Sequence, residues 1–141
     1  MKNRLTLIVA IAAFCSAASV LAGETGKSVV LAKADLKWKS MGDSGIAAAP
    51  VSGDMEKGPC RFFLKYPVGL VTPLHLHSSD HYVTVISGTI TLTVGGKEHR
   101  LAPGSYFMLA DRAPHIAKVE GTEEAVFFIQ ADGPWDVVMA K

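Results

Sequence analysis

The 141-residue sequence has little cysteine, no excess of one charge and no stretch of helical periodicity. Its formal net charge is +1, from 14 basic and 13 acidic residues. A chain this close to neutral offers no basic face, so we expect no nucleic-acid partner. The absence of an apolar period near 3.6 residues argues against helices as the main element of the fold.

The chain has one long uncharged apolar run, and it lies at the N-terminus. Lys2 and Arg4 precede the run from Leu5 to Val20, and the small residue Ala22 follows it. This order is typical of a secretory signal peptide, and the run is short for a membrane span. We therefore predict a signal peptide over residues 1–22, cleaved after Ala22, with a periplasmic or secreted product that has no membrane contact. An uncleaved membrane tether is the alternative.

Cleavage would remove Cys15 and leave Cys60 as the one remaining cysteine. No intramolecular disulfide could then form, so a packed core, helped by a metal or a partner subunit, must supply the stability. We expect Cys60 to be a buried thiol, with a ligand role as the alternative. The rest of the chain divides into an arm over residues 23–60, rich in small residues, and a single β domain over residues 61–141.

From Arg61 onward, short apolar segments alternate with turn residues, which predicts an all-β sandwich or barrel. Ser87-Gly88 predicts a hairpin in which Ile86 pairs with Thr89. On either side of this turn, aliphatic and threonine side chains alternate, so the aliphatic face is expected inside and the threonine face outside. The expected strands are Arg61–Tyr66, Leu74–His77, His81–Ile86, Thr89–Val94, Glu98–Leu101, Ser105–Leu109, His115–Val119 and Glu124–Ala131.

Two histidines share the strand parity of inward-facing aliphatic residues. His81 lies two residues before Val83, and His115 lies two residues before Ala117. Because successive side chains of a strand point to opposite faces, both imidazoles are expected in the interior.

The other histidines divide into a pair and a single residue. His75 and His77 lie two apart and share a face in an extended segment, whereas His99 lies between charged residues beside a Gly-Gly turn and is expected to be exposed. Several imidazoles in one interior have polar nitrogens to satisfy and cannot all be charged. A divalent cation resolves both problems by accepting a lone pair from each neutral ring. The sequence therefore predicts one divalent transition-metal ion (Mn, Fe, Ni, Cu, Co or Zn) on His75, His77, His81 and His115.

The histidine spacing resembles the first motif of the cupin superfamily. Gly69 is followed after five residues by His75-x-His77, after three more by His81, and after six more by Gly88. The usual motif has glutamate at the position of His81, so the alternative is a three-histidine site in which His81 is not a ligand. Four neutral imidazoles would leave the full charge of a metal dication uncompensated.

The segment from Pro103-Gly104 to His115 resembles the second cupin motif, although the asparagine that often follows its histidine is absent. The resemblance implies a cupin-type jelly-roll β-barrel with an N-terminal arm, a metal near one mouth, and a homodimer in which residues 23–60 take part. For function it implies a mononuclear-metal oxygenase of the dioxygenase type acting on a small organic molecule. The alternatives are a metal-binding or ligand-sensing cupin without turnover, or a metal-dependent isomerase or lyase.

Further side chains could line the pocket or support the ligands. Each has an ordinary structural explanation as well, as core packing or as a surface polar group. The candidates are Phe62, Tyr66, Asp80, Tyr106, Phe107 and Gln130.

Overall fold

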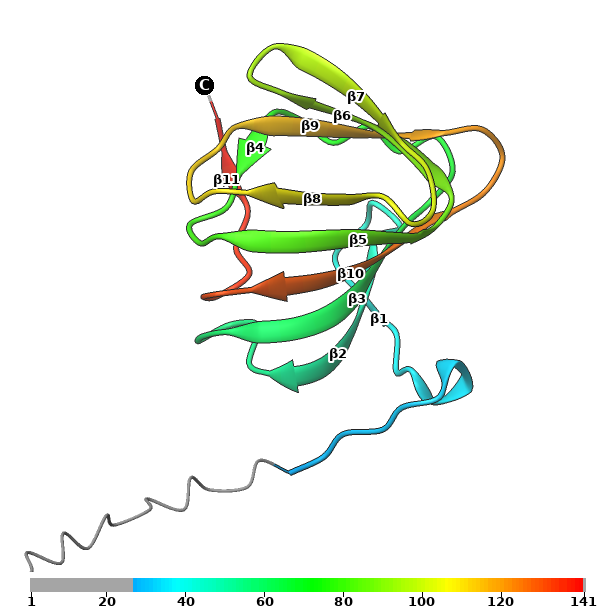
Figure 1. Ribbon diagram of the computed structural model, residues 1–141, viewed down its shortest axis with the longest axis vertical. Helices are drawn as coiled ribbons and strands as arrows, with labels where there is room; N and C mark the ends of the chain where they lie inside the picture. The colour runs from blue at the N-terminus through cyan, green and yellow to red at the C-terminus, as the bar shows by residue number, and fades with distance from the viewer. Residues whose placement is uncertain (1–26, 141) are drawn as a thin grey trace, which may run out of the picture.

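The computed structural model describes residues 27–140, which form two antiparallel β-sheets facing each other around one core (Figure 1). One sheet has six strands in the order β1-β2-β3-β10-β5-β8, and the other has five in the order β11-β4-β9-β6-β7. The predicted all-β jelly-roll architecture is thereby confirmed. The strands are β1 (Lys39–Ser40), β2 (Ala47–Gly53), β3 (Cys60–Tyr66), β4 (His75–Leu76), β5 (His81–Ser87), β6 (Thr89–Val94), β7 (Lys97–Leu101), β8 (Tyr106–Leu109), β9 (His115–Glu120), β10 (Ala125–Ala131) and β11 (Val138–Met139), with a 3-10 turn η1 (Lys33–Asp35) before them.

The core lies between the sheets, and strand parity decides which side chains enter it. Along β10 every second residue is buried, and its neighbours β3 and β5 follow the same alternation. From the five-stranded sheet, β6 and β9 direct Ile90, Leu92 and Val119 toward them. Burying each aliphatic side chain of this size stabilises the fold by about 1.5–3 kcal/mol.

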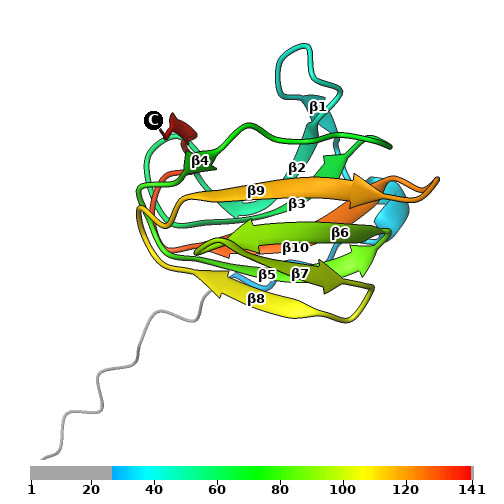
Figure 2. The same cartoon turned by 90° about the horizontal axis from the view of Figure 1, so that it is seen from above.

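The predicted hairpin at Ser87-Gly88 is wrong, although the faces assigned to its two strands are right. β5 pairs with β10 and β8, whereas β6 pairs with β7 and β9 in the other sheet. Ser87-Gly88 is thus a corner where the chain passes from one sheet to the other (Figure 2). Val83 and Ile90 still point inward, because parity continues along each strand whichever strand it pairs with.

The range assigned to the N-terminal arm contains strands of the sheet. β2 pairs with β3 over its length and β1 pairs with β2. The segment before them, residues 27–38, lies outside the sheets. The predicted signal peptide, residues 1–22, falls outside the described residues. Among the described residues, no helix is both long enough and apolar enough to cross a membrane.

We predict that Gly88→Ala destabilises the protein far more than Gly96→Ala. Both glycines have positive φ, 72° and 73°, so an alanine at either position is strained by about 1–2 kcal/mol. At Gly88 the added Cβ would also lie 2.5 Å from the carbonyl oxygen of Glu124, whereas at Gly96 it would meet nothing within 4 Å. Displacing that backbone should cost about 1–3 kcal/mol more. Urea unfolding of the two variants measures the difference, and equal midpoints would contradict it.

Candidate metal centre

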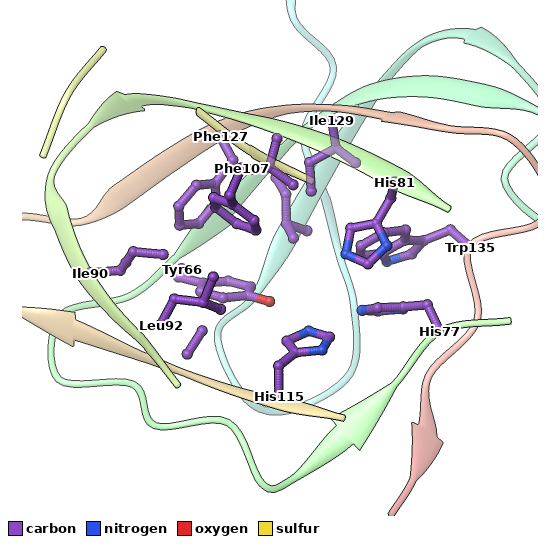
Figure 3. Close-up of a pocket in the computed structure, with 13 residues that line it drawn as sticks. Tyr66, His77, His81, Ile90, Leu92, Phe107, His115, Phe127, Ile129 and Trp135 are labelled. Atoms are coloured by element: carbon purple, nitrogen blue, oxygen red, sulfur yellow. The ribbon is translucent and has the colours of Figure 1, made fainter. Parts of the chain in front are cut away.

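Four histidines meet inside one end of the barrel, near the starts of three strands. His75 begins β4, His81 begins β5 and His115 begins β9, while His77 directly follows β4. Strand pairing brings two of them together, since His75 lies opposite His115 on the neighbouring strands β4 and β9. All four are buried, with side chains 2–5% exposed. Figure 3 shows His77, His81 and His115 directed toward a common space.

Each imidazole has its Nδ1 atom directed at a backbone carbonyl. Three of them contact the carbonyl two residues earlier in the chain: His75 with Pro73 at 2.8 Å, His115 with Ala113 at 2.9 Å, and His81 with Ser79 at 3.4 Å. A carbonyl oxygen can only accept, so Nδ1 must carry the proton and donate. In the neutral ring this fixes the tautomer with the proton on Nδ1 and leaves the lone pair on Nε2.

His77 completes the set with a partner far along the chain. Its Nδ1 donates to the carbonyl oxygen of Asp136, and the Asp136 carboxylate accepts from the Ser78 backbone N–H at 2.9 Å and from its hydroxyl at 2.6 Å. Hydrogen bonds from Ser78 also hold the pKa of the Asp136 carboxyl below its ordinary value. Asp136 therefore holds both the His77 ring and the neighbouring Ser78 in place.

The geometry separates three of the histidines from the fourth. His75, His77 and His115 each offer a ligand atom within 4.8 Å of the others, so these three could hold a metal ion. His81 lies beside them, with its ring centroid 4.7 Å from that of His77 and 5.9 Å from that of His115. His99, the fifth histidine, lies on β7 opposite Leu92 and is not part of this group, but it is half-buried and not exposed as predicted.

Burial keeps three of these imidazoles, those of His77, His81 and His115, in the form that a metal requires. Desolvation is the largest cause that lowers the pKa of His77 to about 3 and that of His115 to about 4, and it lowers the pKa of His81 as well. The neighbouring imidazoles act in the same direction, since like charges would repel. At neutral pH these three rings are therefore uncharged and their Nε2 atoms can act as ligands.

The sequence reasoning missed Trp135, which packs directly against the site. Its indole stacks on His77 with ring centroids 4.0 Å apart and an interplanar angle of 25°, and it meets His81 edge-on at 5.2 Å. Phe62 also meets the indole edge-on, with ring centroids 5.0 Å apart. The Gly-Pro that precedes Trp135 in the sequence predicts a loop, and a loop residue gives no periodic signal of burial.

Three of the predicted pocket residues lie in or directly behind the site. Tyr66 and Phe107 line the lumen, and Phe62 is fully buried behind Trp135. Desolvation raises the pKa of Tyr66 to about 12, so its hydroxyl stays protonated at neutral pH. Figure 3 shows that hydroxyl pointing toward the space between the histidines.

The other three pocket candidates have different roles, which corrects their assignment. Tyr106 is 61% exposed on the outer face of β8, and Gln130 accepts a hydrogen bond from Arg61 on the outer face of β10. Asp80 accepts the backbone N–H of Asp111 at 2.7 Å, so it ties two loops together and does not hold His81. Tyr106 and Gln130 alternate with the buried residues of their strands and so point outward, whereas Asp80 lies in the loop before β5.

The histidines lie where two pockets meet. The lumen pocket is lined by His77, His81 and His115, while the mouth pocket, bordered by Met41, includes His75 and His77. The donor set fits a divalent transition metal, because imidazole nitrogens suit these ions and the lone pairs lie on the correct atoms. No carboxylate lies among the described residues that line either pocket.

Comparison with known proteins supports the same conclusion about the fold. Residues 62–130 match the family described as Cupin domain. A region of 83 residues, 57% of this chain, is 31% identical to DNA damage-repair/toleration protein DRT102 of Arabidopsis thaliana. That region spans only 26% of the plant protein, so the chain corresponds to about a quarter of it.

The similarity to solved structures covers a larger share of both chains. KdgF from Halomonas sp. superposes with a TM-score of 0.62 at 21% identity, over 77% of this chain and 94% of that protein. The polyketide cyclase RemF from Streptomyces resistomycificus superposes with a TM-score of 0.67 at 16% identity, over 82% of this chain and 87% of that protein. At these identities the likeness concerns the fold alone.

We predict that Trp135→Ala weakens metal binding by about 10–100-fold, because removing a group that orients a ligand typically has an effect of this size. Trp135→Phe should lose less, since it keeps a ring against His77. The matched control is Trp38→Ala, an indole that is 37% exposed and lies over Lys65 at 5.2 Å, away from the site. Competition with a fluorescent chelator measures the affinity. Equal losses in the Trp135 and Trp38 alanine variants would contradict the role of Trp135.

Proposed function

Because this chain is a member of the cupin superfamily with neutral histidines converging inside its barrel, we propose that it is a metal-dependent enzyme of the oxygenase type acting on a small organic molecule. The observation that carries the proposal is the set of Nδ1 contacts with backbone carbonyls, which leaves every Nε2 lone pair available to an ion. Imidazoles held in this way serve a metal better than they serve core packing.

His75, His77 and His115 would hold one divalent ion, with His81 as the fourth ligand. Four protein ligands leave positions open on an ion that accepts up to six, and a substrate needs such positions. When bound, a redox-active ion supplies the reaction with dioxygen, and the protein supplies the shape and dryness of the site. The apolar lumen excludes bulk water, while the mouth between Met41 and Trp135 gives access.

The oxygenase assignment is supported by what the lumen offers. Among the described residues that line it, none carries a carboxylate or an amine that could serve as a general acid–base pair. Apart from the Tyr66 hydroxyl and the imidazoles, a reaction in this space would therefore depend on the ion for its chemistry. Transition metals bound by imidazole are suited to reaction with dioxygen beside a bound substrate.

A second candidate is Lewis-acid chemistry of an isomerase, lyase or cyclase. The protonated hydroxyl of Tyr66 favours it, because this group could donate a proton or a hydrogen bond to an oxygen of the substrate. A structural neighbour whose name describes it as a polyketide cyclase has the same fold. Oxygen uptake distinguishes the two candidates, since Lewis-acid turnover proceeds equally well without oxygen. A binding or sensing role without turnover would leave both substrate and oxygen unchanged.

We further propose that residues 1–22 direct export and that the exported protein forms a homodimer. The outer face of the six-stranded sheet carries an apolar strip in which Phe63 and Phe128 lie 5.1 Å apart and Ile86 is 48% exposed. Residues 31–38 border the same strip through Leu31, Leu36 and Trp38. A second copy that covers this strip would remove exposed apolar surface from water.

We expect protein purified without a histidine tag to contain one equivalent of a divalent transition metal. His75→Ala should empty the site, His81→Ala should lower the content less, and His99→Ala should leave it unchanged. Mass spectrometry of the metal content measures all three, and an oxygen electrode then tests the loaded protein against candidate substrates. Equal metal loss in the His75 and His99 variants would refute the site, and turnover without oxygen uptake would favour the second candidate.

The proposed dimer can be tested by a truncation that spares the sheet, whereas removal of all of residues 23–60 would delete β1 and β2. A chain that begins at Lys39 keeps β1 and β2 but lacks the segment that borders the apolar strip. Sedimentation velocity should show a dimer for residues 23–141 and a monomer for residues 39–141. A dimer that survives the truncation unaltered would contradict the role of residues 23–38.

A further inference from the structure

The lumen beside the histidines is apolar on nearly every side. Apart from imidazoles, its described lining offers two polar groups, the hydroxyl of Tyr66 and the indole N–H of Trp135. The remainder is aliphatic and aromatic, with Leu64, Leu92 and Phe127 among the buried members. A ligand in this space can satisfy few hydrogen bonds, so each additional polar group on it would carry a desolvation cost.

The mouth pocket adds little polarity. Thr72 is its one further hydroxyl among the described residues, and its Oγ1 already accepts the backbone N–H of Ala117 at 2.9 Å. Four residues line both pockets and mark the junction where the open face of the metal would lie, namely Leu64, Tyr66, His77 and Trp135. Among the described lining residues, Tyr66 thus carries the one hydroxyl shared by the two pockets.

Charge narrows the class of ligand further. Neutral imidazoles leave a bound dication with its full charge in a low-dielectric space, and no carboxylate of the described lining offsets it. An anionic oxygen ligand would therefore be stabilised strongly there. A second negative charge on the same ligand would find no Lys or Arg among the described lining residues of either pocket.

We propose that the site takes a small monocarboxylate with an apolar body, held by one carboxylate oxygen on the metal and by a hydrogen bond from the Tyr66 hydroxyl. The apolar body lies in the lumen against Leu92, Phe107 and Phe127. This inference rests on the proposed metal function and specifies its substrate class. Tyr66 has its ring fixed edge-on against Phe127 at 5.2 Å, which holds the donor in place. Polyols, dicarboxylates and phosphorylated molecules are excluded, because their additional polar groups would lie unpartnered against hydrocarbon.

The test uses protein loaded with Co(II), whose absorption spectrum reports a change of ligand at the metal. The probes are acetate, butyrate, succinate and glycerate, titrated by absorption and by tryptophan fluorescence. We expect affinity to rise about fourfold for each methylene added from acetate to butyrate, the gain from burying a CH₂ group. Butyrate should bind at least about tenfold more tightly than succinate or glycerate, whose second charge or hydroxyls lack partners.

The variants Tyr66→Phe and Tyr106→Phe each remove one phenolic hydroxyl, the first inside the barrel and the second on its outer surface. Tyr66→Phe should lower the affinity for butyrate by about tenfold, the loss typical for a hydrogen bond to a charged group. The cobalt content should stay the same. Tyr106→Phe should change neither quantity.

Each result separates the inference from the proposal on which it rests. Stoichiometric cobalt with no preference among the four probes, or an unaltered butyrate affinity in Tyr66→Phe, would overturn the substrate class and leave the metal site standing. Failure to retain cobalt, with folding intact by circular dichroism, would overturn the metal function and this inference with it.

Discussion

The site depends on one repeated interaction, the hydrogen bond from a buried imidazole Nδ1 to a backbone carbonyl. Without it, four imidazoles in a common interior would each have two unsatisfied nitrogens and no defined tautomer. With it, one nitrogen of every ring is satisfied by the chain itself, and the other is directed to a shared space. Three of the four carbonyls lie only two residues before their histidine, so a short local backbone arrangement orients most of the ligand set.

These local hydrogen bonds orient each imidazole, but the barrel is what brings the four imidazoles close together. His75, His81 and His115 begin strands of two different sheets, and they meet because both sheets direct the starts of those strands to the same end. The aliphatic core below them excludes water, which keeps the imidazoles of His77, His81 and His115 neutral and would strengthen electrostatic interactions with an ion. Folding energy and the proposed metal chemistry would therefore rely on the same apolar lumen.

Much of this was predictable from the sequence, and the exceptions have physical causes. Strand parity placed His81 and His115 inside, because period-two alternation is a local property of the chain. The Ser87-Gly88 corner was misassigned as a hairpin, since the local turn chemistry is the same and only the remote partners β9 and β10 decide between them. β2 was missed because Ala47–Pro50 has weak strand propensity. Trp135 was missed because a loop gives no pattern.

The contact between His77 and Asp136 also links completion of the site to closure of the barrel. His77 and Asp136 are far apart in the chain, 59 residues, and β11 pairs with β4 beside them. Contacts at such separations cost loop-closure entropy, and the pairing of β3 with β10 spans the chain as widely, with Tyr66 opposite Ala125 and Cys60 opposite Ala131. The histidine positions are therefore completed only when the barrel itself closes, and an early folding intermediate would hold a metal only weakly. A metal bound by these histidines would therefore be taken up by the folded barrel and would add to the stability of that state alone.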